Sequence, residues 1–490
     1  MYLKHFYDTD LAQGSYLIGC QVTGEAIVID PRRDVDVYRA DAAANKLRIT
    51  AVTETHIHAD YLSGSRELAA ATGADLHLSA EGGEEWAYRF EHLPLRHGDV
   101  IMVGNIRLEV MHTPGHTPEH LAFLVTDTAL TDQPAYLLTG DWVFVGDVGR
   151  PDLLDEAAGG VDTRFAGARQ LFATLRDQFM ALPDHVQLWP GHGAGSACGK
   201  ALGAVASSTV GYEKLTAWWR SYVAQDDEAG FTTELLAGQP DAPSYFGRMK
   251  RVNRDGPPVL GARQAMERLE PASLAGRVNR DLVLVDTRGV RQQWQGSVPG
   301  ALSIPGGTSF ATYAGYVFDP ELDRRGVVVL AADRAAAEAF RDRLSYVGID
   351  SVIGYVTSFD GLDLRPARLM TAAELGELVG DRPTNVADAT AADRPDSADR
   401  PDSTDRVDSV HLLDVRSHNE HVTGAVPGSS QMHAGQVLRR LDEVPRGGKL
   451  VLYCQGGGRA AAVAGLLRAR GFGNVYELEG SFDGWSAHVR

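Results

Sequence analysis

The sequence predicts a multidomain protein of the α/β and α+β classes, and three observations lead to that expectation. Short runs of β-branched residues alternate with helical stretches along most of the chain. The second half contains the same set of short motifs twice, in the same order. The length of 490 residues is enough for about three domains.

The first predicted domain covers residues 1–255. Up to about residue 200, β-branched runs end in turn or polar residues, and helical stretches separate them. The runs lie at 26–29, 49–52, 106–110 and 135–138. This pattern predicts stacked sheets with helices outside. Residues 213–255 are more helical, and the sequence DGPP that follows marks a domain boundary.

The second half of the chain carries the repeat. Residues 284–288 (LVDTR) correspond to 412–416 (LLDVR), and in both copies a Gly-x-Val-Pro-Gly segment begins ten residues after the Asp. A buried-type strand and an Ala-rich helix come next in each copy. The repeat predicts two α/β domains with parallel strands, at 260–366 and 367–490. Residues 388–409 repeat Asp-Arg-Pro-Asp-Ser with almost nothing apolar, which predicts a disordered insertion.

Charge and composition exclude several kinds of partner. The chain has 47 Lys and Arg against 65 Asp and Glu, and the net charge of −18 repels phosphate backbones and anionic lipid. We therefore expect no nucleic acid and no membrane partner. No run approaches the roughly 18 apolar residues that a membrane span needs. Three scattered cysteines, Cys20, Cys198 and Cys454, form no disulfide framework, which predicts a reducing cytoplasm.

Metal-ligand side chains follow predicted strands in four separate segments. Each segment stands at a turn with Gly or Pro nearby, and one of them has the spacing His-x-His-x-Asp. The six side chains are His56, His58, Asp60, His116, Asp141 and His192. A single histidine of this kind is usually a surface or capping residue, but four such segments predict one metal pocket. His112 and His120 lie off these motif positions, and we expect them to be structural.

The order of these motifs resembles the metallo-β-lactamase fold superfamily over about residues 1–250. The resemblance implies an αββα sandwich with metal at one edge. Hydrolases of this superfamily such as glyoxalase II carry a histidine directly after the aspartate, where this chain has Tyr61, and its absence disfavours a dinuclear zinc hydrolase. Residues 140–144 (GDWVF) and 149–153 (GRPDL) instead resemble the persulfide dioxygenase branch.

That branch implies a cofactor of Fe(II), one ion per chain. The implied ligands are His56, His116 and Asp141. Two imidazoles and one carboxylate leave open positions for a substrate sulfur and O₂, the arrangement expected for non-heme iron oxygenases. We expect His58, Asp60 and His192 to steer these ligands by hydrogen bonds or to line a vacant second metal site.

Cys454 directly follows a predicted strand and opens the loop CQGGGR, which leads into a helix. Backbone N–H groups of a glycine-rich loop and the helix N-terminus stabilise a thiolate or a bound persulfide. The loop resembles the active-site loop of rhodanese sulfurtransferases, and the repeated motifs resemble rhodanese domains over about residues 260–490. The resemblance implies that Cys454 and Arg459 are catalytic in the second copy. The first copy has Ala331 at the cysteine position and should be silent.

The two other cysteines have less defined roles. Cys198 closely follows His192 in a Gly/Ala segment. Two interpretations stay open for it, a sulfur relay near the metal or a small packed thiol. Cys20 lies in an apolar strand, where we expect packing.

The whole order of domains resembles the fused persulfide dioxygenase-sulfurtransferases. The resemblance implies that a small-molecule thiol persulfide is oxidised by O₂ to sulfite at Fe(II), and that Cys454 passes sulfane sulfur to sulfite to give thiosulfate. It also implies self-association into a homo-oligomer. Two alternatives stay open: a zinc-dependent glyoxalase II-like thioester hydrolase fused to a sulfurtransferase, and a sulfur-relay or sensor protein.

Overall fold

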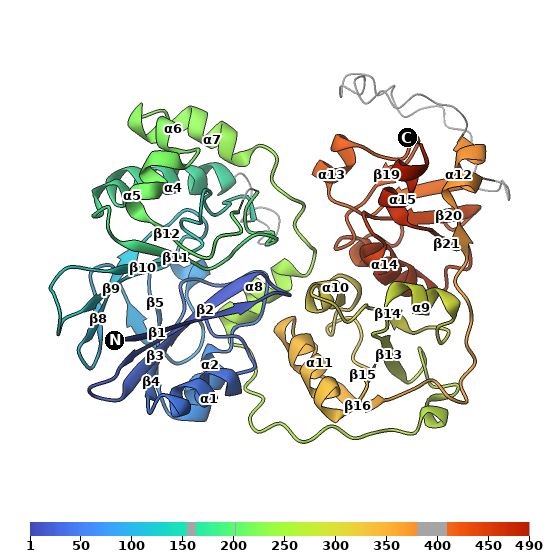
Figure 1. Ribbon diagram of the computed structural model, residues 1–490, viewed down its shortest axis with the longest axis horizontal. Coiled ribbons are helices and arrows are strands. Elements are labelled where there is room, and N and C mark those ends of the chain that lie inside the picture. The colour runs from blue at the N-terminus through green and yellow to red at the C-terminus, as the bar shows by residue number, and fades with distance from the viewer. Residues whose placement is uncertain (154–162, 201, 380–408, 490) are drawn as a thin grey trace. The chain divides into compact units, whose positions relative to one another are not determined.

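The computed structural model describes residues 1–153, 163–200, 202–379 and 409–489, and Figure 1 labels its elements. It divides into two compact units, Met1–Gln264 with Ser345–Gly348, and Ala265–Leu344 with Ile349–Arg490. The expected insertion at 388–409 lies, except for its last residue, outside the described residues. Within the described part, no helix has both the length and the apolar character needed to cross a membrane.

The N-terminal unit is built on two six-stranded sheets. The first runs in chain order through β1 (Tyr2–Asp8), β2 (Gln13–Cys20), β3 (Glu25–Ile29), β4 (Arg48–Thr53), β5 (Asp75–Ser79) and β6 (Leu93–Leu95). The second has the order β12-β11-β10-β9-β8-β7. Its strands are β7 (Val100–Val103), β8 (Ile106–His112), β9 (Leu121–Asp127), β10 (Tyr136–Gly140), β11 (Gln187–Pro190) and β12 (Ser208–Thr209).

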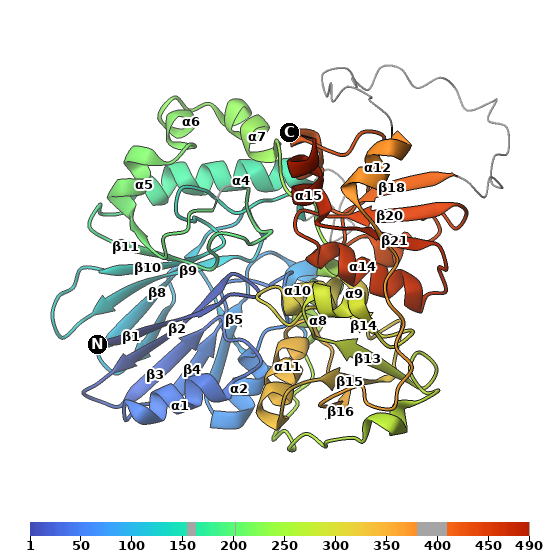
Figure 2. The ribbon, with the colours of Figure 1, turned by 45° about the vertical axis from the view of Figure 1, so that its right-hand side comes forward.

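Helices cover the outer face of each sheet, as Figure 2 shows. The helices of this unit are α1 (Asp36–Ala44), α2 (Ser65–Thr72), α4 (Thr163–Asp177), α5 (Val210–Thr216), α6 (Arg220–Ala224), α7 (Glu228–Leu236) and α8 (Phe246–Asp255), with short 3₁₀ turns η1 (Glu84–Trp86) and η2 (Phe179–Ala181). α1 and α2 pack on the first sheet, and α4 to α7 pack on the second. The order of layers is therefore αββα, which confirms the predicted fold.

The core follows the period of two that a strand imposes on its side chains. On neighbouring positions of β2, Leu17 faces the outer helices, whereas Ile18 faces the second sheet. Ile18 and its neighbours meet Leu108 and Phe123 of the opposite sheet in one buried cluster. Cys20 lies in the same cluster. The two sheets thus present alternate residues of each strand to a common core.

Three strands of the second sheet end at one edge. β10 pairs in parallel with β11, and β8 runs in the same direction because β9 is antiparallel to both β8 and β10. The segments that follow these strands carry His116, Asp141 and His192, and His56 follows β4 of the other sheet. The topology therefore collects the predicted metal ligands from four positions that are distant in sequence.

The C-terminal unit contains two parallel sheets. The first has the order β14-β13-β15-β16, with β13 (Leu282–Asp286), β14 (Leu302–Ser303), β15 (Gly326–Leu330) and β16 (Val352–Val356). The second has the order β17-β21-β20-β18-β19, with β17 (Leu369–Met370), β18 (Val410–Asp414), β19 (Ser430–Gln431), β20 (Lys449–Tyr453) and β21 (Val475–Leu478). Corresponding strands of the two copies occupy corresponding places, and β17 is an added edge strand.

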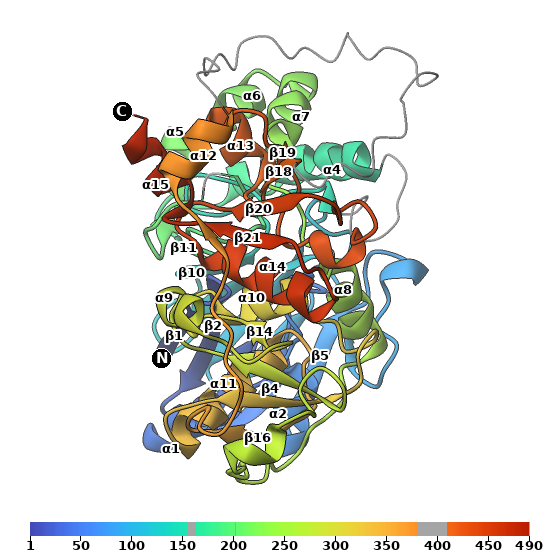
Figure 3. The same ribbon diagram turned by 90° about the vertical axis from the view of Figure 1, so that its right-hand side faces the viewer.

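The helices of this unit are α9 (Val290–Gln295), α10 (Phe310–Val317), α11 (Arg334–Tyr346), α12 (Ala372–Val379), α13 (His418–Thr423), α14 (Gly458–Ala469) and α15 (Ser481–His488), with 3₁₀ turns η3 (Pro271–Leu274) and η4 (Val437–Arg439). Figure 3 shows α14 beside β20 and β21 of its own sheet. α14 also packs on β14 of the other sheet. A Cβ at Gly465 would lie 2.5 Å from the backbone nitrogen of Ser303, so only glycine allows this approach.

Candidate functional site

Three of the predicted ligands form one buried cluster. The ligand atoms of His56, His116 and Asp141 all lie within 4.8 Å of one another, and all three residues are buried. Nε2 of His116 is 3.5 Å and Nε2 of His56 is 3.9 Å from Oδ2 of Asp141. Two nitrogens and one carboxylate oxygen therefore converge on a space that a metal ion could fill.

Hydrogen bonds at the far side of each ring fix which nitrogen faces this space. Nδ1 of His116 lies 2.9 Å from the carbonyl oxygen of Arg150, which can only accept, so Nδ1 carries the proton. Nδ1 of His56 lies 2.9 Å from Oγ1 of Thr55, whose hydroxyl donates to Asp30. His56 therefore donates from Nδ1 as well. Both Nε2 lone pairs remain available for a metal, the usual arrangement for histidine ligands.

Burial keeps these imidazoles neutral. It lowers the pKa of His56 well below the ordinary histidine value and also lowers the pKa of His116, for which the nearby Asp141 only partly compensates. A metal binds the neutral imidazole, so no proton has to leave either ring at neutral pH. The pair is therefore in the form that coordination requires.

The carboxylate of Asp141 has no hydrogen-bond partner, although both oxygens are buried. A buried carboxylate without a partner is costly unless a cation accompanies it. Its backbone N–H donates to Nε2 of His120, 3.0 Å away, and Nδ1 of His120 lies 2.8 Å from Oγ1 of Thr113. These contacts hold the Asp141 backbone and leave the carboxylate free, so the donor set fits a metal ion.

The GRPD motif, residues 149–152, also contacts the ligands Asp141 and His116. A Cβ at Gly149 would lie 1.9 Å from the carbonyl oxygen of Asp141, so only glycine lets this segment approach. Arg150 is fully buried, and its Nε donates to Oδ1 of Asp152 at 2.8 Å. The carbonyl of Arg150 thereby stays where it accepts from His116. Arg150 thus orients the ring of His116, and Gly149 leaves space for the main chain of Asp141.

His58 lies outside this cluster. Its Nε2 is 3.2 Å from Oδ1 of Asp30, and its ring is tilted against that of His56, with centroids 4.2 Å apart. Burial opposes protonation of His58, but the charge and hydrogen bond of Asp30 outweigh it and raise its pKa to about 9. His58 is thus engaged in an ion pair with Asp30 and does not offer its Nε2 to a metal. Asp30, which the sequence did not single out, also accepts from Thr55, and Thr55 in turn contacts His56.

A second group of donor atoms adjoins the first. The ligand atoms of Asp60, His192 and Cys198 lie within 4.8 Å of one another, and all three residues are buried. Nε2 of His192 is 3.5 Å from Oδ2 of Asp60 and 3.7 Å from Oδ2 of Asp141. The carboxylate of Asp60 and Nε2 of His192 have no hydrogen-bond partner. Cys198 therefore lies beside the metal pocket, the location that one of its two interpretations requires.

Tyr61 does not contribute a ligand. Its hydroxyl donates to the carbonyl oxygen of Asp30 at 3.2 Å and accepts from Nε2 of Gln13 at 3.1 Å.

Asn253 of α8 holds the loop that contains Tyr61. Its Nδ2 donates to the carbonyl oxygens of His58 and Tyr61, each at 2.7 Å. Oδ1 of Asn253 accepts from the N–H of Ser63 at 2.9 Å.

The Cys454 loop lies in the C-terminal unit, at the end of β20. The N–H of Gly457 donates to Sγ of Cys454 at 3.1 Å, and α14 begins at the next residue. Gly457 has a φ of 104°, which favours glycine. The N–H of Cys454 donates to Oγ of Ser481 at 3.3 Å. One backbone donor and a helix N-terminus therefore meet the sulfur, whereas the loop sequence predicts several backbone N–H groups there.

Arg459 forms a bidentate ion pair with Glu420 of α13. Its Nη1 and Nη2 lie 2.6 and 2.7 Å from the two carboxylate oxygens. Burial alone would raise the pKa of Glu420, but Arg459 outweighs it and lowers that pKa to about 2. Arg459 is thus held rigidly near Cys454. The sequence analysis missed Glu420, although the capping box that it forms with Ser417 was a local signal.

The repeated Asp-x-Arg motif makes the same ion pair in both copies. Oδ2 of Asp286 and of Asp414 lies 2.7 Å from Nη2 of Arg288 and of Arg416, respectively. Ala331 is buried at the end of β15, the counterpart of β20, so the first copy has no thiol at this position.

Two family profiles match the chain. Residues 8–192 match the metallo-beta-lactamase superfamily, and residues 395–488 match the rhodanese-like domain. A solved metallo-beta-lactamase from Staphylococcus aureus subsp. aureus COL has 37% sequence identity and a TM-score of 0.63, and the match covers 73% of this chain and 98% of that one.

Curated relatives with different activities match between a third and two fifths of the chain. A hydroxyacylglutathione hydrolase of a Polaromonas species is 37% identical over 181 residues, which are 36% of this chain and 61% of that protein. The persulfide dioxygenase ETHE1 of Bos taurus is 26% identical over 194 residues, which are 39% of this chain and 67% of that protein. The chain spans less than two thirds of the first of these relatives.

Proposed function

Because the chain joins a metallo-β-lactamase superfamily domain to a C-terminal rhodanese-like domain, we propose that it is a persulfide dioxygenase with an attached sulfurtransferase. The N-terminal site oxidises the terminal sulfur of a small-molecule thiol persulfide to sulfite, with two oxygens from O₂ and one from water, and the S–S bond breaks to release the carrier thiol. The C-terminal site then combines sulfite with sulfane sulfur to give thiosulfate.

The observation that carries the proposal is the cluster of two neutral imidazoles and one carboxylate. His56, His116 and Asp141 would hold a single Fe(II), and His58 is withdrawn from it by Asp30. When bound there, Fe(II) would supply open coordination positions and a redox-active centre through which electrons pass from the substrate sulfur to O₂, whereas zinc is not redox-active. Persulfide dioxygenases of animals are among the matching relatives, which supports the same choice.

The second donor group has the atoms needed to hold a substrate. Asp60 and His192 have polar atoms without hydrogen-bond partners, which would bind the S–H proton of the persulfide and the oxygens of the sulfite formed from it. Cys198 stands with them and would be the thiol closest to a newly formed sulfur species. The roles of these three residues are to orient the substrate and to exclude bulk water.

The transfer step needs no cofactor. The Cys454 thiolate attacks the outer sulfur of a second persulfide, so that a new S–S bond forms on Cys454 and the carrier leaves as a thiolate. Sulfite then attacks the outer sulfur of the Cys454 persulfide, and thiosulfate leaves as the Cys454 thiolate is restored. The N–H of Gly457 stabilises the negative charge on Sγ between the two steps.

A zinc-dependent thioester hydrolase is the second candidate for the N-terminal site. The 37% identity to a hydroxyacylglutathione hydrolase favours it, as does the second donor group beside the first. The missing ligand at Tyr61 argues against it, because a hydroxyl bound to Asp30 does not coordinate. Hydrolysis of a hydroxyacylglutathione by the zinc-loaded chain would separate the two candidates.

The test is oxygen consumption by the purified chain after anaerobic loading with Fe(II). We expect rapid uptake on addition of glutathione persulfide, none with the zinc-loaded protein, and sulfite as the product. The Cys454→Ser variant should consume oxygen at the same rate but release sulfite in place of thiosulfate. Fe(II)-loaded protein that takes up no oxygen with any of several persulfides would exclude the dioxygenase.

A further inference from the structure

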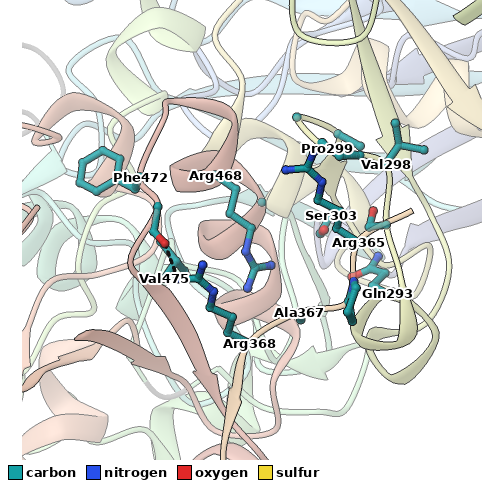
Figure 4. A pocket seen from close by; sticks show the side chains of 16 residues that line it. Gln293, Val298, Pro299, Ser303, Arg365, Ala367, Arg368, Arg468, Phe472 and Val475 are labelled. Carbon is teal, nitrogen blue, oxygen red and sulfur yellow. Dashed lines mark hydrogen bonds between the residues drawn. The ribbon is translucent and has the colours of Figure 1, made fainter. Parts of the chain in front are cut away.

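A cavity of about 270 Å³ lies inside the C-terminal unit, far along α14 from the Cys454 loop (Figure 4). Four stretches of chain supply its lining: Gln293 of α9 and residues within 297–303 in the first copy, residues 365–368 between the copies, and residues within 465–475 in the second copy. All four belong to one compact unit. Neither copy alone would form this space.

The charge of the lining is unusual for this chain. Arg365, Arg368 and Arg468 line the cavity, and no carboxylate does. The chain as a whole has a net charge of −18. Glu477 offsets the charge of Arg468, and the exposed Asp363 offsets part of that of Arg365, but the three guanidinium groups still leave an excess of positive charge at the cavity. The lining therefore creates a local positive potential that attracts an anion.

The arginines keep donors to spare after their contacts with the protein. Nη2 of Arg468 lies 2.8 Å from Oε1 of Glu477, and Nη1 of Arg368 donates to the carbonyl oxygen of Gly473 at 2.6 Å. Nε of Arg365 is 3.5 Å from the exposed carboxylate of Asp363. A guanidinium has five N–H donors in a planar fork that matches phosphate and carboxylate groups.

Gln293 adds an independent sign of a ligand. Its side chain lines the cavity and is 4% exposed. Nε2 donates to the carbonyl oxygens of Asp286 and Arg288 at 2.9 and 2.8 Å, which fixes the orientation of the amide. Oε1 is buried and has no hydrogen-bond partner. A buried acceptor of this kind is costly unless a donor such as a ligand hydroxyl satisfies it.

We propose that this cavity is a binding site for a small organic anion that carries at least two phosphate or carboxylate groups and a hydroxyl. The anionic groups pair with the three guanidinium groups, and the hydroxyl donates to Oε1 of Gln293. The site is separate from Cys454, because Gly465 and Arg468 lie roughly 10 Å or more along the helix axis from Gly458. The ligand bridges the two copies and stabilises their contact.

The test measures binding to the full iron-loaded chain by titration calorimetry and thermal unfolding. Fructose 1,6-bisphosphate probes phosphate esters and tartrate probes carboxylates, each against NaCl at the same ionic strength. We expect at least one probe to bind with a Kd below about 1 mM, about 10-fold or more tighter than its binding to the arginine variant described next. That probe should also raise the unfolding temperature of the C-terminal unit by several degrees.

The variant is the double substitution Arg365→Gln with Arg368→Gln, both at exposed positions that should not affect folding. We expect its affinity to fall at least 10-fold. Arg440→Gln is the matched control, because Arg440 is partly exposed and pairs with Glu443, and neither residue lines the cavity; this variant should bind as the wild type does. Arg468→Lys keeps the positive charge beside Glu477 but loses the planar, two-pronged donor geometry of the guanidinium group. We expect its affinity for the probe to lie between those of the wild type and the double variant.

Each outcome decides the proposal. Binding of the bisphosphate alone identifies a phosphate ester, binding of tartrate alone identifies a polycarboxylate, and binding of both shows that the site reads charge. If neither probe binds at 10 mM, the proposal is overturned. Equal binding by the wild type and the double variant overturns it too, since the anion would then lie elsewhere. Oxygen consumption and thiosulfate release are measured separately, so a failure of the proposed function would not imitate either result.

Discussion

The backbone N–H of Asp141 donates a hydrogen bond of 3.0 Å to Nε2 of His120. His120 contributes no ligand atom to the donor cluster, yet it fixes the main chain from which the carboxylate extends. Its ring also stacks against that of His56, with centroids 5.1 Å apart. His120 is therefore a positioning residue for two of the three ligands.

Replacing His120 by Ala should weaken metal binding about 10- to 100-fold, the usual cost of losing a residue that orients a ligand. The Asp141 N–H would lose its partner, and the space left would let the His56 ring move. Metal affinity is measured by competition with a chelator. His112→Ala is the control, because the His112 ring donates from Nε2 to the carbonyl oxygen of Pro118 at 2.8 Å rather than to the chain around Asp141. Equal affinity in both variants would assign His120 a purely structural role.

Replacing His116 by Ala should abolish both metal retention and oxygen consumption. The variant loses one of two imidazoles, and the Asp141 carboxylate keeps its unfavourable burial. Metal content by mass spectrometry should fall from one ion per chain to a small fraction. Transfer of sulfur from thiosulfate or a persulfide at Cys454 should be unchanged, since that site lies in the other compact unit. Retained iron and activity would disprove the ligand assignment.

Replacing Gly457 by Ala should reduce sulfur transfer by about 10-fold or more. An alanine is strained at a φ of 104°, and any relief of this strain moves the N–H away from Sγ of Cys454. Gly456→Ala is the matched control, because a Cβ there meets only an ordinary contact with Asp483 at 3.7 Å. Rates of thiosulfate release with added sulfite measure the difference. Similar rates in the two variants would show that this donor is dispensable.

The Glu420–Arg459 ion pair should make the stability of the C-terminal unit depend on pH in the acid range. Folding lowers the pKa of Glu420 from an ordinary 4.5 to about 2. The stabilisation is therefore complete above about pH 4.5 and is lost as the pH falls towards 2. Compared with Glu420→Gln, the wild type should gain about 1–2 kcal/mol at pH 6, and this advantage should shrink at pH 3. Urea unfolding at both pH values measures it, and a difference that does not change with pH would contradict the assignment.

Replacing Asn253 by Ala should destabilise the metal loop. The amide is buried, donates to two carbonyl oxygens and accepts one N–H, all from residues 58–63. Removing it leaves these backbone groups without partners, at a cost of about 2–4 kcal/mol. We expect a lower thermal midpoint and weaker metal binding together. A control in the same helix is Arg251→Ala, which changes an exposed position and leaves the Asn253 amide in place. An unchanged metal affinity in Asn253→Ala would limit Asn253 to global stability.

Much of the metal site was predictable because its ligands are encoded locally. His-x-His-x-Asp and the Pro-Gly-His segments each follow a strand, and strand ends meet at one edge of the sandwich. The residues that orient the ligands were not predictable. Asp30 lies 28 positions before His58 and Asn253 lies 192 positions after Tyr61, and nothing in the sequence around either marks its partner. Only the packing of the fold brings them together.

The same limit applies to the cysteines and the arginines. The loop around Cys454 predicts its donor because a glycine turn and a helix start are local features. Cys198 lies beside Asp60 although the two residues are more than 130 positions apart, so their proximity depends on how the chain folds and not on local sequence. The cavity needs arginines from two separate segments, 365–368 and α14, and each arginine looks like an ordinary charged surface residue in sequence.

The contact of Gly465 with Ser303 sets a limit on how this half of the chain can be divided. α14 is buried on nearly all sides, with one face against its own sheet and the other against β14. A fragment that began at residue 367 would bare the second face, an alanine- and leucine-rich surface suited to aggregation. We therefore expect the second copy to be less soluble without the first, so that loss of the copy that lacks a cysteine would also affect the copy that carries Cys454.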